Sequence, residues 1–494
     1  MHPARAQAGQ LKGASASEPK PVKELAAWVL KEFQGAGDRA AVLLDGNMSN
    51  EAISAGIAFA REVVRTQNVC VYIPPADEAL LNGLTATEAK FGTPEELADC
   101  DVLLVVGDPF ASHPVISEYI LRARRKARGN DLTVIDSMSG RTLKYATTPI
   151  LVKPGQEAAA LAALLKELAP ESLPAGIATE MRMAGPAARI KKAAKLGIVI
   201  AVPDGKTTAA EAIGALCGSL AQARSAVLVP LFTYGNAYGA YAIARASGLK
   251  LFGSAVSSEA FRAAAKLLAV GTSAETLSLV EAKSVVWAEP FARKAGGEVA
   301  ATLPLAMPFE GSGTVCDGSG RERTIGPVVA PPAGAVSAEE LFQMLGVSGA
   351  AAKPSLGRTP TLYADRAGAI RLAADVSARA GELLCLPIYD ATGTYDGFAT
   401  RLCSWSRQIL TEPVLYLNPK DGSGLGLRSG MYVRLRAGNA RLRVRAELST
   451  DVPEGVSAVN SSFPEARKLF AQRIDSVAGL LRITPGSIMV EGVA

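Results

Sequence analysis

Few side chains in this sequence could carry redox or hydrolytic chemistry. There are two histidines, His2 and His113, and six cysteines, at positions 70, 100, 217, 316, 385 and 403. The cysteines are too far apart along the chain for a Cys-x-x-Cys clamp, so local spacing predicts neither a zinc site nor an iron-sulfur cluster. A Ser or Cys hydrolase would need a histidine base, and only His113 could supply one, because His2 lies in a polar N-terminal arm. The favoured interpretation of the cysteines is reduced, buried thiols.

The stretch "DVLLVVGDPFASHPV" (101–115) sets His113 beside a turn that could bind phosphate. An apolar run ends in Gly107-Asp108-Pro109, and a helical pattern begins after Ser112 and His113, which are candidate caps. Free backbone N–H groups at the carboxyl end of a parallel strand are where phosphates and dinucleotides bind. By itself, however, the turn is better explained as the link between a buried strand and a helix.

The elements that would position this turn are short Val-, Ile- and Leu-rich runs alternating with amphipathic segments. The predicted strands cover 40–46, 69–73, 101–107, 132–136 and 149–152, with a second series that includes 225–232 and 284–291. Strands alternating with helices predict parallel sheets that are covered on both faces.

The composition changes along the chain and predicts five parts. Residues 1–20 are predicted to be a disordered arm, 21–195 a first α/β domain, 196–291 a second α/β unit, 292–380 a loop-rich crossover completing the α/β core, and 381–494 a β-barrel. In the last part apolar and polar residues alternate with period two between turns such as "RAGNAR", which is typical of an antiparallel barrel.

Charge and hydropathy exclude some partners. Lys and Arg exceed Asp and Glu by only 52 to 47, and no basic tract is interleaved with aromatic residues, so nucleic acid is not an expected partner. No run approaches the roughly 18 apolar residues of a membrane span, and the N-terminus lacks the apolar core of a signal peptide. The expectation is a cytoplasmic protein without direct membrane insertion.

The order of segments resembles the molybdopterin oxidoreductase superfamily. "ADCDVLLVVGDPFASHPV" is similar to that family's strand-turn-helix, and "LTVIDSMSGRTLKYATTPILVKPGQEAAALAALL" to the strand, threonine-bearing loop and helix that follow. "YDATGTYDGFATR" and "EPVLYLNPKDGSGLGLRSGMYVRLRAG" resemble the C-terminal barrel that closes over the pterin dinucleotide. The resemblance implies an α/β fold of parallel-sheet, Rossmann-like domains followed by that barrel. It also implies cofactor-binding positions, functional or vestigial, at Gly107, Asp108, Pro109, His113, Asp136, Thr142, Thr392 and Gly393.

Within the superfamily, residues 284–346 are most similar to the large iron-sulfur subunit of respiratory NADH dehydrogenase, complex I. Leu303-Pro304, Glu310, Gly313-Thr314 and Gly320-Arg321 match its motifs in order. That subunit keeps the fold without the metal cofactor. Catalytic members instead have an N-terminal cysteine cluster and a metal ligand next to a histidine. Here no cysteine precedes Cys70, which remains only a weak candidate ligand because no histidine follows it.

Two interpretations remain open, and the first is preferred. In the first, the chain is a structural subunit of a complex I type NADH:quinone oxidoreductase or a related electron-transfer complex. It then has a degenerate cofactor site, no bound metal or cofactor, and iron-sulfur and other subunits as partners, and is peripheral to the inner membrane through them. In the second, the chain is a catalytic subunit of a formate or formylmethanofuran dehydrogenase-like enzyme. It then binds molybdopterin guanine dinucleotide, and the iron-sulfur clusters lie on a partner chain.

Overall fold

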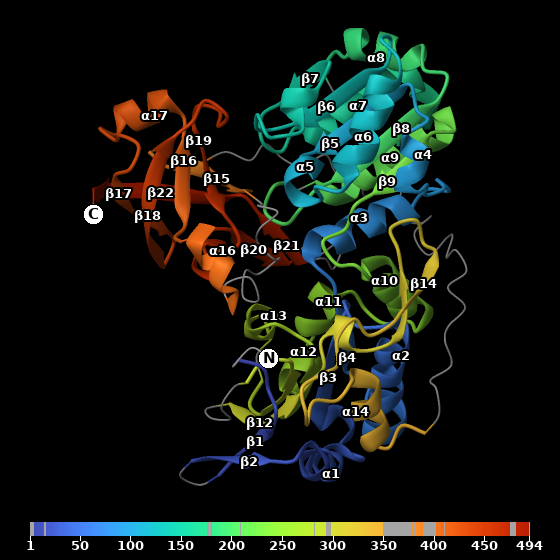
Figure 1. Cartoon of the computed structure of the whole chain (residues 1–494), viewed down its shortest axis with the longest axis vertical. Coiled ribbons are helices and arrows are strands. Elements are labelled where there is room, and N and C mark those ends of the chain that lie inside the picture. Colours follow the sequence, from blue (N-terminus) through green and yellow to red (C-terminus); the bar gives the residue numbers. More distant parts are fainter. Residues whose placement is uncertain are drawn as a thin grey trace. The chain divides into compact units, whose positions relative to one another are not determined.

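The computed structural model describes residues 4–348 (without 14–15, 175–176, 178–179, 208, 281 and 293–297), 378, 381–388, 402–409, 411–474 and 481–493. The chain forms two compact units, each built from separate segments (Figure 1). Unit 1 comprises Met1–Pro74, Tyr234–Thr359 and Ile474–Leu481, and unit 2 comprises Pro75–Thr233, Pro360–Arg473 and Arg482–Ala494. This division differs from the consecutive domains expected from the sequence, because the predicted first domain contributes strands to both units.

Unit 1 is built on a seven-stranded sheet in the order β2-β1-β12-β11-β10-β3-β4. Its strands are β1 (Gly9–Lys12), β2 (Ser17–Lys20), β3 (Ala40–Asp45), β4 (Val69–Tyr72), β10 (Lys266–Val270), β11 (Val285–Glu289) and β12 (Val299–Pro304). The five strands from β12 to β4 are parallel, and every residue of β3 and β4 is buried. Burial on both faces explains why these strands are continuous apolar runs in the sequence.

Residues 1–20, expected to be a disordered arm, contain the β1–β2 hairpin. β1 pairs antiparallel with β12 and closes one side of the sheet. Arg5 adds a buried ion pair with Glu310 and donates from Nε to the carbonyl of Pro290 (3.0 Å). The small residues that suggested disorder are needed for this packing, because a Cβ at Gly9 would lie 2.5 Å from the carbonyl oxygen of Thr302. Composition alone does not reveal that β12 offers an edge.

The helices and remaining strands of unit 1 complete its core. The helices are α1 (Val22–Phe33), α2 (Asn50–Ala58), the π-helix η2 (Phe59–Val64), α10 (Ala237–Ala246), α11 (Phe252–Val256), α12 (Glu259–Ala263), α13 (Ala274–Ser278) and α14 (Ala338–Met344), with the 3-10 turns η1 (Gly37–Arg39) and η5 (Pro308–Glu310). A hairpin forms from β13 (Gly313–Cys316) and β14 (Glu322–Ile325). The segment predicted as a loop-rich crossover therefore contains β12, this hairpin and α14.

Unit 2 contains a five-stranded, all-parallel sheet in the order β7-β6-β5-β8-β9. Its strands are β5 (Val102–Gly107), β6 (Asp131–Asp136), β7 (Thr148–Leu151), β8 (Leu196–Ala201) and β9 (Val227–Pro230). The chain runs outward from β5 to β7 and then returns to β8 on the other side of β5. The strand order therefore reverses between β5 and β8, and the carboxyl edge at such a point is where ligands bind in open α/β sheets.

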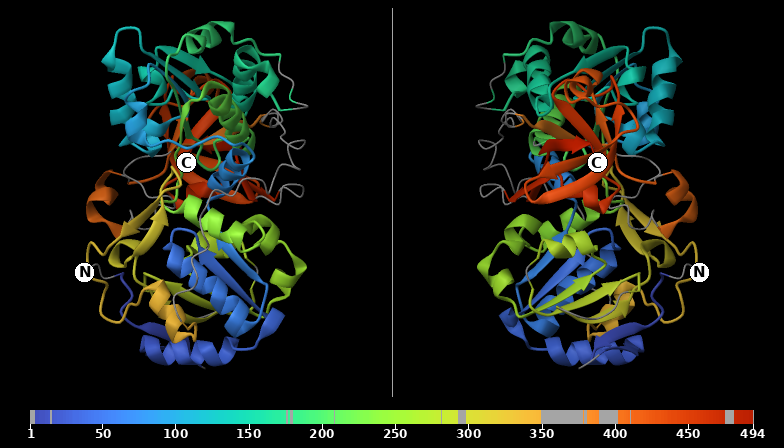
Figure 2. Two further views of the ribbon diagram at one scale, coloured as in Figure 1. Left: turned by 90° about the vertical axis from the view of Figure 1, so that its right-hand side faces the viewer. Right: turned by 90° about the vertical axis from the view of Figure 1, so that its left-hand side faces the viewer.

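Helices cover this sheet in both side views (Figure 2). They are α3 (Pro75–Thr85), α4 (Pro94–Leu97), α5 (Pro109–Ser112), α6 (Ile116–Lys126), α7 (Glu157–Leu168), α8 (Ala184–Lys191) and α9 (Ala210–Arg224), with 3-10 turns η3 (Leu143–Tyr145) and η4 (Pro170–Ser172). The buried face of α6 (Ile116, Ile120 and Ala123) packs in one apolar cluster with Leu103 and Val105 of β5. Its opposite face carries the charged residues, as expected for an amphipathic helix.

The C-terminal part of unit 2 is a closed six-stranded barrel in the order β15-β19-β16-β18-β17-β22. Its strands are β15 (Leu383–Ile388), β16 (Val414–Leu417), β17 (Tyr432–Ala437), β18 (Ala440–Leu448), β19 (Val456–Asn460) and β22 (Gly486–Val493). The short helices are α16 (Ser404–Ile409), α17 (Pro419–Gly424) and α18 (Pro464–Arg467), and β20 (Ala471–Ile474) pairs with β21 (Leu481–Thr484). The predicted class, parallel-sheet α/β domains followed by a β-barrel, is confirmed. The barrel is not purely antiparallel, since β15–β19 and β16–β18 run parallel. The alternation of apolar and polar residues indicates which face of a strand is buried, but it does not indicate the direction of the strand.

Segments around the barrel contact the carboxyl edge of the five-stranded sheet. Ser139, in the loop after β6, donates its N–H to the carbonyl of Asp451 (3.0 Å), and Gly205, after β8, donates to the carbonyl of Ile483 (2.9 Å). Lys144 forms an ion pair with Asp451 (2.6 Å). The loops that would border a ligand are therefore held by the C-terminal part of the chain. Among the described helices, none is long and apolar enough to cross a bilayer.

Candidate cofactor site

The Gly107-Asp108-Pro109 turn links β5 to a helix, as the sequence predicts, but a short helix, α5, already begins at Pro109. Ser112 and His113, the candidate caps, lie at the end of α5, and α6 begins at Ile116 without a side-chain cap. Gly107 ends the strand with φ +90°, a conformation that favours glycine, and a Cβ there would collide with the carbonyl oxygen of Ala201 at the end of β8. Pro109 is the first residue of α5, where its missing N–H costs nothing. Glycine at position 107 therefore lets β5 and β8 approach closely at the point where the strand order reverses.

Asp108 is fully engaged with the loop that follows β6. Its Oδ1 accepts from the N–H and the hydroxyl of Thr142 (2.9 and 2.6 Å), and its Oδ2 accepts from the N–H of Arg141 (2.9 Å). The Thr142 hydroxyl in turn accepts from the N–H of Phe110 (3.0 Å). The carboxylate also touches Gly140, where a Cβ would collide with Oδ2. Asp108 and Thr142 thus join two loops of the carboxyl edge to each other.

His113 directly follows α5 as its C-cap residue, and both of its ring nitrogens bind groups of the chain. Nε2 lies 2.9 Å from the carbonyl oxygen of Phe232, and Nδ1 lies 2.9 Å from the Ser112 hydroxyl. A carbonyl can only accept, so Nε2 carries the proton. Burial lowers the pKa of His113, which favours the neutral ring, although the bond to Phe232 partly opposes this. His113 therefore has no nitrogen left for a metal or a substrate.

Asp136 ends β6 and forms a buried ion pair with Lys206, which lies in the loop after β8. Lys206 Nζ lies 2.8 Å from Oδ2, and the exposed fractions of the two side chains are 8% and 1%. The other carboxylate oxygen, Oδ1, accepts from the N–H groups of Ser137 (2.6 Å) and Met138 (3.3 Å). Burial opposes the charge on Lys206, but Asp136 and then Asp108 favour it and raise the pKa of Lys206. The ammonium group is therefore retained inside the protein.

Glu157, the first residue of α7, adds a second buried carboxyl group beside this pair. Its side chain is buried, and neither Oε1 nor Oε2 has a hydrogen-bond partner of normal geometry among the described residues. The hydroxyl of the fully buried Ser137 is also without one. Burial raises the pKa of Glu157 to about 7, and the neighbouring Asp136 adds to the effect. Buried polar atoms without a hydrogen bond of normal geometry are rare in folded proteins, and here the two side chains lie beside each other.

Lys206 and Glu157 were not predicted from the sequence. Lys206 follows the strand 196–201, whose apolar run "LGIVIA" is a signal that could have located it at the carboxyl edge. Glu157 follows a Pro-Gly step at the start of a helix, where an acidic residue is common because it complements the helix dipole. Only its burial distinguishes it from an ordinary first-turn glutamate.

Cys70, the weak candidate ligand, lies inside β4 in unit 1 and is fully buried. It packs in an apolar cluster with side chains such as Leu43, Tyr72 and Phe252. Cys100 and Cys385 lie in two further clusters of their own, and burial raises the pKa of these thiols to about 11 and about 12. In the described ranges, no group of three or more His, Cys, Asp and Glu side chains is arranged to hold a metal ion. Thr392 and Gly393 lie outside the described residues.

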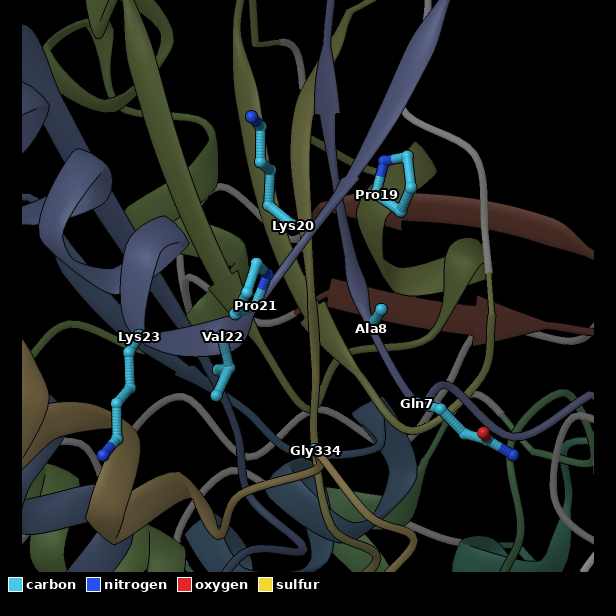
Figure 3. A pocket seen from close by; sticks show the side chains of 8 residues that line it. All are labelled: Gln7, Ala8, Pro19, Lys20, Pro21, Val22, Lys23 and Gly334. Carbon is cyan, nitrogen blue, oxygen red and sulfur yellow. The ribbon is translucent and has the colours of Figure 1, made fainter.

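A surface cavity of about 510 Å³ lies in unit 1, beside the N-terminal hairpin (Figure 3). It is lined by Gln7, Ala8, Pro19, Lys20, Pro21, Val22, Lys23 and Gly334. Figure 3 shows the amine ends of Lys20 and Lys23 pointing in different directions. The lining therefore presents no convergent set of catalytic groups.

The residues at the carboxyl edge of unit 2 fit a pterin dinucleotide only in part. At Asp108, His113, Asp136 and Thr142 the polar atoms already bind other groups of the chain. Glu157 and Ser137 are different, because neither side chain has a hydrogen bond of normal geometry to a described residue, although Ser137 lies close enough to Glu157 to favour its charged form. Most of the predicted binding positions therefore have a structural role here, and two unpredicted residues, Glu157 and Ser137, form a buried polar pair beside them.

Comparison with known proteins agrees with this geometry. Residues 394–483 match the model of the molydopterin dinucleotide binding domain. The solved structure of acetylene hydratase from Pelobacter acetylenicus has the same fold, with a TM-score of 0.70 and 12% identity over 99% of this chain and 93% of that one. The chain thus shares its fold with acetylene hydratase, and residues 394–483 resemble a molydopterin dinucleotide binding domain.

Two further matches are partial. A nitrate reductase from Shewanella frigidimarina (strain NCIMB 400) is 30% identical over 142 residues, which are 27% of this chain and only 15% of the reductase. A chain of the formyltransferase/hydrolase complex from Methylorubrum extorquens, solved with methylofuran, gives a TM-score of 0.47 at 16% identity over 68% of this chain and 97% of that chain. The second score is too low to support a conclusion.

Proposed function

We propose that this chain is a structural subunit of a multi-subunit electron-transfer complex of the NADH dehydrogenase (complex I) type. In this role its molybdopterin oxidoreductase fold provides a scaffold, and electrons pass through cofactors held by partner subunits. The complex would be peripheral to the inner membrane, with iron-sulfur subunits as direct partners.

The observation that carries the proposal is the engagement of the predicted cofactor positions within the chain. Asp136 receives Lys206 and two backbone N–H groups, so both of its oxygens are occupied. Asp108 and Thr142 satisfy each other, and both ring nitrogens of His113 have partners. A dinucleotide that used these groups would compete with these bonds, and a buried group left unpaired costs about 1–3 kcal/mol.

The distribution of thiols supports the same conclusion. An iron-sulfur cluster needs about four thiolates brought together, whereas Cys70, Cys100 and Cys385 lie in three separate apolar clusters. Thiols with raised pKa values also stay protonated near neutral pH, and it is the thiolate that binds metal. The described residues therefore bring no set of thiols together that could hold an iron-sulfur cluster.

A second function, catalysis with a bound pterin dinucleotide, is favoured by the buried carboxyl group of Glu157 and hydroxyl of Ser137, which form no hydrogen bond of normal geometry with a described residue. In that case the two side chains would hold the nucleotide base, and the cofactor would supply the redox or hydration chemistry. The names nitrate reductase and acetylene hydratase indicate that this fold serves both kinds of reaction.

The test is to purify the chain from its own cells with all associated subunits and to analyse each for molybdenum, tungsten, iron and released guanine nucleotide. We expect a cluster-bearing subunit to copurify. We also expect this chain, once separated, to contain far less than one metal or nucleotide per molecule. One guanine nucleotide per chain, lost in Glu157→Ala but kept in Glu167→Ala, would favour the second function. Glu167 is a suitable control because it is an exposed residue of the same helix.

A further inference from the structure

The outer face of the barrel carries arginines that lie directly opposite one another on two neighbouring strands. In the antiparallel pair β17–β18, Arg434 pairs in register with Arg443, and Arg436 pairs with Arg441. We call these four residues the arginine ladder. The residues that alternate with them, such as Val433 and Val444, are buried in the barrel core, so the arginines point outward.

Like charges directly opposite on adjacent strands destabilise a sheet, and among the described residues an ion pair offsets this for one ladder residue. Arg436 forms an ion pair with Glu491 of β22 (2.8 Å). Arg434, Arg441 and Arg443 are exposed, and none has an ion-pair partner among the described residues. Arg443 instead lies over the ring of Tyr432, with its guanidinium carbon 4.0 Å from the ring centroid.

The strands on either side leave these three arginines unneutralised. On β22 the residue in register with Arg434 is Gly492, which has no side chain. On the other side of the hairpin, the acidic residues Glu412 and Glu447 both form ion pairs with Arg445. The acidic side chains next to the hairpin are therefore used by Arg436 and Arg445.

We propose that the arginine ladder binds an extended acidic segment of a partner protein. Guanidinium groups form paired hydrogen bonds with carboxylates, and Arg443 is already held in place by Tyr432. Alternate residues of an extended chain are spaced like alternate residues of β17 and β18, so Asp or Glu at every second position would meet successive arginines. The segment would compensate the repulsion that the described residues leave uncompensated. The identity of the partner as a subunit of the complex rests on the proposed function, whereas binding to acidic chains does not.

The experiment compares two triple variants of the full chain that lose the same charge. Arg434→Gln/Arg441→Gln/Arg443→Gln removes the unpaired ladder residues, and Arg122→Gln/Arg125→Gln/Arg128→Gln removes three exposed arginines at the end of α6. The probe is a fluorescent peptide of alternating Glu and Thr, followed by anisotropy at about 0.15 M salt. We expect at least about tenfold weaker binding for the ladder variant and less than about twofold for the α6 variant. An equal loss of peptide affinity in both variants would overturn the proposal. So would single-stranded RNA that binds more tightly than the peptide and depends on the ladder arginines.

A copurification arm separates this inference from the proposed function. We expect partner subunits to be recovered with the wild-type chain and the α6 variant, and to be depleted with the ladder variant. Undiminished recovery with the ladder variant would overturn the ladder as a partner contact and leave the proposed function standing. If no subunit copurifies with the wild-type chain, the proposed function fails, while ladder-dependent peptide binding would still support the acidic-segment chemistry.

Discussion

Lys206 Nζ lies 2.8 Å from Oδ2 of Asp136, and the two residues join the loops after β8 and β6 inside unit 2. Asp108 and Glu157 also act on Lys206, so three carboxyl groups surround one ammonium group. Three ionised carboxylates around a single buried cation would be expensive, because charges removed from water need compensation. The raised pKa of Glu157 is the way in which this site avoids one of those charges.

Lys206→Met should destabilise the protein by about 3–5 kcal/mol, because it leaves Asp136 as a buried charge without its partner. The measurement is the free energy of unfolding from urea denaturation, followed by a signal from unit 2. The double variant Asp136→Asn/Lys206→Met should recover most of the loss, since the neutral amide can still accept from the N–H groups of Ser137 and Met138. A Lys206→Met variant within about 1 kcal/mol of the wild type would show that the pair is not desolvated as described.

The free energy of unfolding should depend on the protonation of Glu157. Its pKa is 4.5 in an ordinary environment and about 7 in the folded protein, so between these values the folded state keeps a proton that the unfolded state has lost. The stabilisation is complete below about pH 4.5 and is lost as the pH rises through about 7, a total of about 3 kcal/mol.

Urea denaturation between pH 4.5 and pH 8 checks this dependence. Glu157→Gln should remove that part of the pH dependence and be more stable than the wild type at pH 8, while Glu167→Gln, on the exposed side of the same helix, should behave as the wild type. If the free energy of unfolding of Glu157→Gln changes with pH as it does in the wild type, another group is responsible for the titration.

Gly140→Ala should destabilise the protein by about 1–3 kcal/mol, because the added Cβ would collide with the Asp108 carboxylate that holds Arg141 and Thr142. Gly185→Ala is the control, since nothing lies within 4 Å of its Cβ position in α8, and it should be neutral or stabilising. Thermal unfolding of both variants gives the comparison. In a protein that already carries Asp108→Ala, the Gly140→Ala substitution should lower the stability by less. If the two losses of stability simply add, the contact between Gly140 and Asp108 is contradicted.

Cys70→Ala should lower the free energy of unfolding by about 1 kcal/mol through lost packing in β4, and leave the electron-transfer activity of the assembled complex nearly unchanged. Cys217→Ala is matched to it, because that thiol is also fully buried but lies in α9 of the other unit. Activity is compared at equal amounts of folded complex. Loss of activity and of bound metal in Cys70→Ala alone would instead identify Cys70 as a ligand.

The sequence by itself determined the strands of both parallel sheets that it predicted, and the final barrel. Ala40–Asp45, Val102–Gly107 and Asp131–Asp136 lie within a residue of the predicted ranges. Strands buried on both faces are mainly apolar, so the local sequence indicates where they begin and end. The turn at Gly107 was predictable for the same reason, since a glycine and a proline directly end such a run.

Only the tertiary structure decided which strands share a sheet and which polar groups meet. Residues 1–20 became a hairpin because β12 offers an edge, which nothing in their own composition reveals. Lys206 and Asp136 are 70 residues apart and pair because β6 and β8 both end at the same edge, on either side of β5. The protonation of Glu157 depends on burial and on Asp136. Desolvation and Coulomb energies depend on distances in the folded chain, and for residues so far apart in sequence those distances are fixed only when the sheet assembles.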